Sequence, residues 1–207
     1  MEKCVFPNGI YEFNGGITSI YVRKRCFSSL LSILVYNSFR LEKDMDKCIR
    51  KSTLDDLPRI SEILYGCRNF MKNSGNPNQW EDMDRVIRKT KEDIALGNSY
   101  VYIEEGVIHA VFTLALGIDP TYILIEKGQW LNDEPYVTIH RIGSDFSRRG
   151  ILKMAVELAL TMANNVRVDT SIDNAPMRNG LEKLGFRYCG IIYIDTGESR
   201  LAYQLEK

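Results

Sequence analysis

The chain has 207 residues, enough for one full-sized domain with a short appendage. Lys plus Arg balances Asp plus Glu at 27 each, so no overall positive charge favours binding to nucleic acid or to an anionic membrane. The hydrophobic fraction of 44% and the charged fraction of 26% are typical of a soluble globular protein, and no apolar run approaches the roughly 20 residues of a membrane span. We therefore expect no nucleic-acid partner and no membrane partner.

The five cysteines and two histidines limit the chemistry that the chain can carry. The cysteines are scattered, odd in number and never spaced as CxxC, so neither a disulfide framework nor a zinc site is predicted. With only His109 and His140 as imidazole ligands, we expect no metal. Free thiols are typical of a reducing compartment, which predicts a cytoplasmic protein. The cysteines are Cys4, Cys26, Cys48, Cys67 and Cys189.

Residues 1–44 differ in pattern from the rest of the chain. A basic run, 22–25, precedes a mostly apolar stretch, 26–39, as in a secretory signal peptide. However, the basic run begins only at Val22, serines interrupt the apolar stretch, and no small-x-small cleavage site follows. We therefore interpret residues 1–44 as an N-terminal extension of unknown role, which either packs on the domain as a hairpin or helix or precedes a natural start at Met45. An interaction element that builds an assembly, such as a homodimer, is the third interpretation.

From residue 46 onward the periodicity becomes regular. Residues 47–51 alternate as in a strand. Thr53 with Asp56 resembles a helix-capping pair, and apolar residues recur every three or four positions from Leu54 to Phe70. This spacing predicts an amphipathic helix, and a second helix is predicted over 84–96.

The remaining predicted elements alternate between strands and helices. Glu105 and Gly106 mark a hairpin turn between two strands. Asn174 followed by Pro176 is typical of a helix start, and Gly185 of a helix end. The elements predicted from 99 onward are strands 99–104, 107–116 and 136–142, helix 151–162, strand 166–170, helix 174–184, and strands 186–194 and 200–205. The order predicts a mixed α/β fold.

Three segments together resemble the core of the GCN5-related N-acetyltransferases (GNAT). A strand, 138–142, leads through the loop 143–150 into a helix, and a second strand leads to Asp-Asn-Ala-Pro-Met at 173–177. The last helix closes with Leu-Glu-Lys-Leu-Gly-Phe at 181–186, which is the most specific piece. The resemblance covers 45–207. It implies the acyl-CoA N-acyltransferase fold, a mixed, mostly antiparallel central sheet flanked by helices.

The resemblance implies acetyl-CoA as co-substrate, and the residues give a physical reason. A glycine-containing loop that runs into a helix presents unpaired backbone N–H groups and the positive end of the helix dipole to a pyrophosphate. Two arginines add charge there, although a solvated basic helix start is the alternative. Of the family's phosphate motif, Gln/Arg-x-x-Gly-x-Gly/Ala, only the central glycine is present. The residues expected at this end of the cofactor are Arg148, Arg149, Gly150, Ile151 and Leu152.

In this family the strand before the loop splays from its neighbour and pairs with the pantetheine arm. The resemblance places this pairing at Ile142 and Ser144, with Gly143 allowing close approach. It also places a backbone N–H near Ile142 at the thioester carbonyl. Asn174 and Met177 are expected beside the cofactor, although capping of the last helix is an equal alternative for Asn174.

The catalytic groups depart from the family pattern. The family often has a tyrosine as general acid in the last helix, and Leu181 stands at that position. Tyr188 or Tyr193 could replace it, although tyrosines in terminal strands commonly belong to the core. His140 is the candidate base, because its strand is similar to a His-x-His strand of the family, with Thr138 at the first position. It could take a proton from an ammonium acceptor, directly or through water; a packed strand histidine is the alternative.

The acceptor pocket is expected between the first two helices and the irregular connection before the strand of His140. Exposed aromatic residues in loops are typical ligand walls, and packing beneath the loops is the equal alternative. Glu126 could hold a cationic amine, although loop carboxylates are commonly just solvated. The predicted substrate-binding residues are Trp80, Glu126, Trp130 and Tyr136.

We therefore predict an enzyme that passes an acetyl group from acetyl-CoA to the amine of a small molecule or protein. Direct attack within a ternary complex is the expected mechanism, because holding both reactants together lowers the entropic part of the barrier. The alternative is a catalytically degenerate acyl-CoA-binding or sensor module. The missing tyrosine and the reduced phosphate motif favour that alternative.

Overall fold

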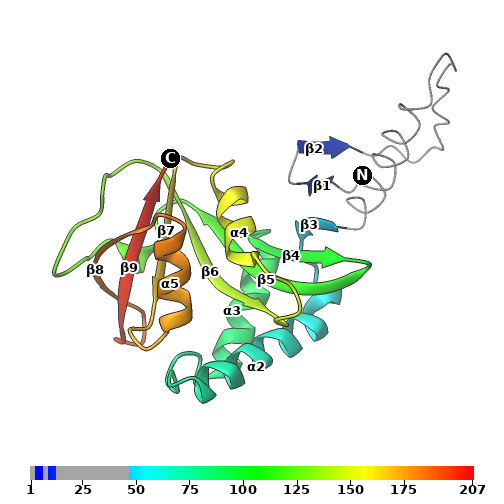
Figure 1. Cartoon of the computed structure of the whole chain (residues 1–207), viewed down its shortest axis with the longest axis horizontal. Coiled ribbons are helices and arrows are strands. Elements are labelled where there is room, and N and C mark those ends of the chain that lie inside the picture. The colour runs from blue at the N-terminus through cyan, green and yellow to red at the C-terminus, as the bar shows by residue number, and fades with distance from the viewer. Residues whose placement is uncertain (1–2, 7–8, 13–46) are drawn as a thin grey trace, which may run out of the picture.

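The computed structural model describes residues 3–6, 9–12 and 47–207, and these fold around one nine-stranded sheet (Figure 1). The strands are β1 (Lys3–Phe6), β2 (Gly9–Glu12), β3 (Lys47–Lys51), β4 (Ser99–Glu104), β5 (Val107–Leu116), β6 (Tyr136–Ser144), β7 (Asn165–Thr170), β8 (Arg187–Tyr193) and β9 (Ser199–Glu206). Their order is β2-β1-β3-β4-β5-β6-β7-β9-β8. Neighbouring strands are antiparallel except β6 and β7, which run parallel. The predicted mixed, mostly antiparallel sheet is confirmed.

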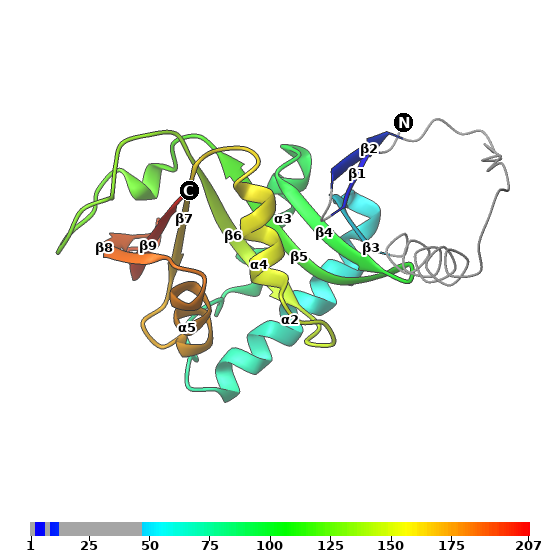
Figure 2. The ribbon, with the colours of Figure 1, turned by 45° about the horizontal axis from the view of Figure 1, so that its top comes forward.

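Helices cover both faces of the sheet (Figure 2). They are α2 (Leu57–Asn73), α3 (Met83–Ala95), α4 (Ile151–Ala159) and α5 (Ala175–Lys183), with 3-10 turns η1 (Leu54–Asp56) and η2 (Pro120–Tyr122). Alternate residues of β5 point to opposite faces: Val111 packs in a core with α2 and α3, whereas Phe112 packs in a core with α4 and α5. The sheet is therefore the middle of three layers.

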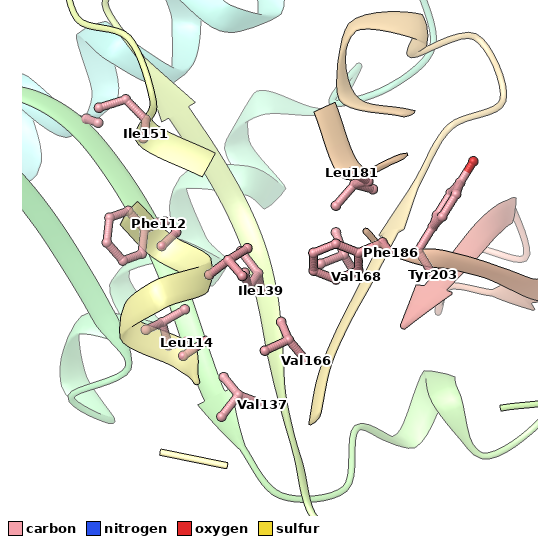
Figure 3. Close-up of a cluster of buried hydrophobic side chains, with 14 of the residues drawn as sticks. Phe112, Leu114, Val137, Ile139, Ile151, Val166, Val168, Leu181, Phe186 and Tyr203 are labelled. Atoms are coloured by element: carbon pink, nitrogen blue, oxygen red, sulfur yellow. The ribbon is translucent and has the colours of Figure 1, made fainter. Parts of the chain in front are cut away.

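The larger core lies between the sheet and the pair α4 and α5 (Figure 3). Val137 and Ile139 of β6 meet Val166 and Val168 of β7, and all four are at most 2% exposed. Leu181 of α5 is fully buried in the same cluster. Burial of this apolar area, which is worth about 25 cal/mol per Å² removed from water, fixes both helices on the sheet.

Local signals at the start of α2 agree with the structure. The Thr53 N–H donates to Asp56 Oδ2 at 2.7 Å, which confirms the predicted capping pair. A two-pronged hydrogen bond from Arg50 lowers the pKa of Asp56 despite its burial. Leu54 and Phe70 were predicted on the apolar face, but they are 61% and 44% exposed. Leu54 lies in the turn before α2, where the helical periodicity has not begun.

Several element bounds differ from the prediction by one to three residues. The helix α4 ends at Ala159 rather than at 162, because residues 161 and 162 form a turn and Met162 is 37% exposed. Strand β6 continues to Ser144 because its ladder with β5 persists to the pair Ala110–Ser144.

Near the N-terminus, β1 pairs with β2 and also with β3, where Val5 lies opposite Ile49. These short strands extend the sheet beyond β3, as a hairpin-like extension does. The basic run 22–25 and the apolar stretch 26–39 lie outside the described residues. No helix in the described part of the chain has the length and apolar character required to cross a membrane.

Candidate active site

Strands β6 and β7 diverge in the middle of the sheet. They pair at three positions only, from Tyr136–Asn165 to Thr138–Arg167, although β6 continues to Ser144. Beyond Thr138, β6 is therefore paired with β5 alone among the described strands. A cavity of about 1100 Å³ lies at this divergence. The sequence-predicted residues that line it are Trp80, His140, Ile142, Gly143, Ser144, Ile151, Leu152, Asn174 and Met177.

A β-bulge interrupts β6 beside the cavity. Val111 lies opposite Gly143 and Thr113 opposite His140, so two residues of β6 occupy the space of one on β5. One of them, Arg141, has a φ of 45°, which is unusual for a residue other than glycine. Its guanidinium is bonded to Asp93 of α3. The bulge breaks the regular ladder beside residues that line the cavity, His140 to Ser144.

Gly143 brings helix α2 against the bulge. A Cβ at this position would lie 3.1 Å from Cys67 Sγ and 3.3 Å from Leu64 Cδ2, both on α2. The Cys67 thiol also bonds the Ser144 backbone, with 3.3 Å to both its nitrogen and its carbonyl oxygen. Burial raises the pKa of this thiol. Gly143 and Ser144 therefore serve the contact with α2 in addition to lining the cavity, and their pairing with the pantetheine arm stays a prediction.

The start of α4 presents open backbone donors to the cavity. Gly150 is its N-cap with a left-handed φ of 81°, and no acidic residue lies in the first turn. Ile151 and Leu152 follow, and both line the cavity. Backbone N–H groups in a first helical turn have no partner within the helix. This end of α4 can therefore accept an anionic group.

The two arginines before α4 differ in their environment. Arg148 Nε donates to Glu104 Oε2 at 2.5 Å, so its charge is already paired. Arg149 is exposed. Neither residue lines the cavity, and their predicted contacts with the cofactor stay a prediction. Of the two, Arg149 is the one with an exposed side chain and no carboxylate partner within the described part of the chain.

The loop before α4 is anchored by a residue that the sequence did not single out. Asp145 Oδ2 accepts from Arg59 at 2.8 Å and lies 2.9 Å from His109 Nδ1. Its other oxygen accepts from the Ser147 hydroxyl at 2.6 Å. Burial opposes ionisation of Asp145, but the hydrogen bonds from Ser147 and His109 outweigh it and lower its pKa. These contacts join residues that are 36 and 86 positions apart, so no local sequence pattern predicts them.

His140 lies between two carboxylates on the cavity wall. Its Nε2 is 2.7 Å from Asp119 Oδ2, and its Nδ1 is 3.7 Å from Asp169 Oδ1. The Tyr122 hydroxyl donates to Asp169 at 2.7 Å. Because Asp119 precedes a proline in a loop, its sequence indicated only a turn. The structure therefore places two carboxylates, Asp119 and Asp169, around the candidate base.

Solved structures identify the fold family. An acetyltransferase of the GNAT family from Streptococcus agalactiae is 30% identical to this chain and superimposes with a TM-score of 0.69, over 78% of this chain and 95% of its own. The chain belongs to the GNAT family of acetyltransferases. As in the sequence-based prediction, it is an acetyltransferase enzyme.

More distant GNAT-like structures share the fold alone. A putative acetyltransferase from Staphylococcus aureus is 20% identical, with a TM-score of 0.57 over 76% of this chain and 97% of its own. RimJ from Mycobacterium smegmatis, solved in complex with CoA-disulfide, is 14% identical, with a TM-score of 0.50 over 77% of this chain and 81% of its own. No family model matches this GNAT sequence, and no curated protein matches it either.

Asn174 has two roles in this GNAT chain. Its Oδ1 accepts from the Met177 N–H at 3.2 Å, which caps α5. Its Nδ2 donates to Gln79 Oε1 at 2.9 Å, and Asn76 donates to the same oxygen at 2.7 Å. The amide therefore ties α5 to the loop that carries Trp80, which also lines the cavity.

Three of the predicted acceptor residues do not line the cavity. Trp130 donates its indole N–H to the Tyr122 carbonyl at 2.9 Å and packs beneath the loop. The Arg167 guanidinium lies 4.1 Å from the Trp130 ring and 3.9 Å from the Tyr136 ring. Glu126 is exposed and accepts from the Tyr193 hydroxyl at 3.0 Å. Trp130 and Tyr136 therefore match the alternative interpretation, packing beneath the loops, because their rings are in cation–π contact with Arg167.

The tyrosines proposed as a replacement acid also lie outside the cavity lining. Tyr188 on β8 is 51% exposed and packs edge-on against Tyr203. Tyr193 is bonded to Glu126 at the sheet edge. Leu181, at the family's tyrosine position, is fully buried in the core. The structure therefore brings His140, but neither tyrosine, to the cavity.

An ion pair lies on one side of the cavity. Arg85 of α3 pairs with Asp195, which lies in the turn between β8 and β9. Both residues line the cavity, and they are 110 positions apart in sequence. The pair links the helical side of the cavity to the C-terminal hairpin.

Proposed function

We propose that this acetyltransferase takes its acetyl group from acetyl-CoA and passes it to the amine of a small molecule or protein by direct attack. The divergence of β6 and β7 carries the proposal. It opens one cavity that reaches the backbone donors of α4 on one side and His140 on the other. Both reactants can then be held together, so proximity supplies much of the acceleration.

The residues around α4 fit the anionic part of the cofactor. The first turn of α4 holds free N–H groups and no acidic side chain, and Gly150 presents no Cβ. Ile151, Leu152 and Met177 give an apolar wall beside these donors. An anion at a helix N-terminus gains from both the donors and the dipole. Arg149 adds an exposed positive charge at the surface.

The bulge in β6 supports the chemical step. Preorganised N–H donors aimed at a developing oxyanion commonly contribute several kcal/mol to catalysis. In our proposal the backbone N–H near Ile142 polarises the thioester carbonyl, and His140 removes a proton from the amine. With Leu181 at the tyrosine position, the CoA thiolate leaves without a side-chain acid from α5. We expect this absence to cost rate without preventing turnover.

The proposed acetyltransferase domain comprises residues 45–207, with residues 1–44 as an extension of unknown role. We place the protein in the cytoplasm, where buried thiols such as Cys67 and Cys189 stay reduced. The fully buried Leu181 favours a second candidate, an acyl-CoA-binding or sensor module without turnover.

One pair of measurements separates these two functions. Calorimetry and thermal shift with acetyl-CoA should show saturable binding and a higher melting temperature, since a ligand that binds only the folded state stabilises it. A thiol assay with a broad panel of amines should then show CoA release with the correct acceptor. Absence of acetyl-CoA binding would overturn both functions, whereas binding without release from any amine would favour the sensor.

A further inference from the structure

We infer that Asp119 and Asp169 divide two tasks around His140, which deepens the proposed function and rests on it. Asp119 is a positioning residue that holds His140 with its proton on Nε2. Asp169 receives the ammonium group of the acceptor beside the unprotonated Nδ1. The substrate class that follows is an aliphatic amine that is cationic at neutral pH.

The Asp119 carboxylate is fixed in place. Its Oδ1 accepts from the Thr121 N–H at 2.9 Å and from the Thr121 hydroxyl at 2.7 Å. Its own backbone N–H donates to the Tyr136 hydroxyl oxygen at 3.0 Å. Oδ2 is left to His140 Nε2 at 2.7 Å. The carboxylate therefore cannot turn away from the imidazole without losing bonds at its other oxygen.

The charge of Asp119 decides the tautomer of His140. Burial opposes ionisation, but the hydrogen bonds from His140 and Thr121 outweigh it and lower the pKa of Asp119 to about 2. An ionised carboxylate only accepts hydrogen bonds, so Nε2 must carry the proton. The neutral imidazole then has its lone pair on Nδ1.

Asp169 stands at the other nitrogen, but it is too far away to bond it directly. The 3.7 Å between Nδ1 and Asp169 Oδ1 exceeds a hydrogen bond. Burial and the neighbouring Asp169 carboxylate raise the pKa of Tyr122. Its hydroxyl therefore stays protonated and donates to Asp169 Oδ1. Arg200 Nε lies 4.0 Å from the other oxygen of Asp169. Because His140 and Asp169 both line the cavity, a cation that enters it can contact both.

An ammonium group fits between His140 Nδ1 and Asp169, because it is positively charged and carries several N–H donors. One N–H can donate to Asp169, while a second proton passes to His140 Nδ1. The freed lone pair then forms the N–C bond to the acetyl carbonyl, and the C–S bond breaks. The thiolate takes one of the two protons left on the attacking nitrogen and the other stays on the amide, so the products are an amide, CoA thiol and an imidazolium. Asp119 stabilises that imidazolium.

The charged and titratable groups around His140 come from four elements. Asp119 and Tyr122 belong to the loop with η2, Asp169 to β7, and Arg200 to β9. On β6 itself, the next residue, Arg141, is paired with Asp93 of α3. Asp119 and Asp169 are the carboxylates nearest to the two ring nitrogens of His140 among the described residues.

Nitrogen-15 NMR of the full-length protein tests the tautomer with His140 and its two carboxylates unchanged. The chain has two histidines, so His109→Gln assigns the signals. We expect Nε2 to be protonated and Nδ1 bare above neutral pH in the absence of any acceptor. A protonated Nδ1 in the neutral ring would overturn the role of Asp119, whether or not the enzyme turns over.

The task of Asp169 is tested with butylammonium chloride as probe and butanol as its neutral counterpart. Butylammonium should shift the Nδ1 signal of the wild type, and Asp169→Asn should abolish the shift, whereas butanol should produce none. Asp133→Asn, an exposed loop carboxylate outside the cavity lining, is the matched control. Equal shifts in wild type and Asp169→Asn would overturn the ammonium site.

Kinetic measurements with an amine found in the acceptor panel distinguish the roles of the two carboxylates. Asp119→Asn should lower kcat about tenfold or more and move the acid limb of the pH profile to lower pH, because the imidazolium loses its counter-charge. Asp169→Asn should raise KM for the amine about tenfold with the dissociation constant of acetyl-CoA unchanged. An unmoved pH profile in Asp119→Asn would contradict positioning. If no amine is turned over but the NMR results hold, the proposed function fails and the ammonium site stands.

Discussion

Gly143 of β6 and Gly66 of α2 differ in the space around them. A methyl group at Gly143 would be tightly packed, since Cys67 Sγ would lie 3.1 Å from it on a buried helix face. Gly66, exposed on α2, would meet nothing within 4 Å. The same substitution should therefore act in opposite directions at these two positions.

We predict that Gly143→Ala lowers the free energy of unfolding by about 1–3 kcal/mol through overpacking. Gly66→Ala should raise it by roughly 0.5–1 kcal/mol, because alanine loses less conformational entropy in a helix interior. Urea unfolding monitored by circular dichroism measures both changes. A stabilised Gly143→Ala variant would show that α2 can move away from β6 at little cost.

Asp119 should also make stability depend on pH. Its pKa is about 2 in the folded state against an ordinary value of 3.8, so its ionised form stabilises the fold above pH 4. That contribution, about 2 kcal/mol, is lost as the pH falls from about 4 toward 2. In urea unfolding, the difference between wild type and Asp119→Asn should shrink over this range. Asp55→Asn, on an exposed turn, should show no such trend, and a constant difference for Asp119→Asn would contradict the linkage.

At the scale of elements, the bulge in β6 depends on one ion pair. Asp93 and Arg141 have side chains only 11% and 19% exposed, and Asp93 also accepts from the Thr113 hydroxyl at 2.7 Å. Asp93→Ala should therefore lower the free energy of unfolding by about 2–3 kcal/mol, because it leaves a guanidinium unpaired in a mostly buried site. The matched control is Glu92→Ala, which breaks the exposed pair with Lys89 and should cost under about 1 kcal/mol. Equal losses in the two variants, measured by urea unfolding, would show that the bulge does not need Asp93.

The elements themselves were largely predictable because their signals are local. Apolar spacing and caps marked α2 and α5, and Asn174 caps α5 in the structure. The bulge was not predictable, since its left-handed residue is an arginine rather than a glycine. The divergence of β6 and β7 was expected from the family resemblance alone, because it depends on how separate segments pack and no single residue at 139–144 signals it.

The candidate site shows the same limit. Residues of the strand-loop-helix motif reached the cavity, because the motif is contiguous in sequence. Asp119 and Asp169 were missed because each approaches His140 only after the sheet forms. Trp130 and Tyr136 were predicted to line the acceptor pocket because exposed aromatic rings were expected there. In the structure both rings pack against the Arg167 guanidinium.

For the whole molecule, the proposed boundary at residue 45 can be tested by truncation. The S. agalactiae enzyme superimposes on 78% of the chain, close to the share of residues 45–207. A chain that begins at Met45 should therefore keep its far-ultraviolet circular dichroism and its acetyl-CoA affinity. Light scattering of both forms shows whether residues 1–44 change the oligomeric state. An unfolded truncated chain would mean that β1, which pairs with β3, belongs to the domain.

The divergence of β6 and β7 has a consequence beyond catalysis. An open sheet normally ends at two outer strands, but here β6 beyond Thr138 also has no partner on its β7 side among the described strands. Any extended chain that can pair there would serve as a substitute strand, and such exposed strands promote association between molecules. If the pantetheine arm fills this gap as proposed, acetyl-CoA also protects the protein from aggregation. Its concentration in the cell would then set how long the enzyme survives as well as how fast it works.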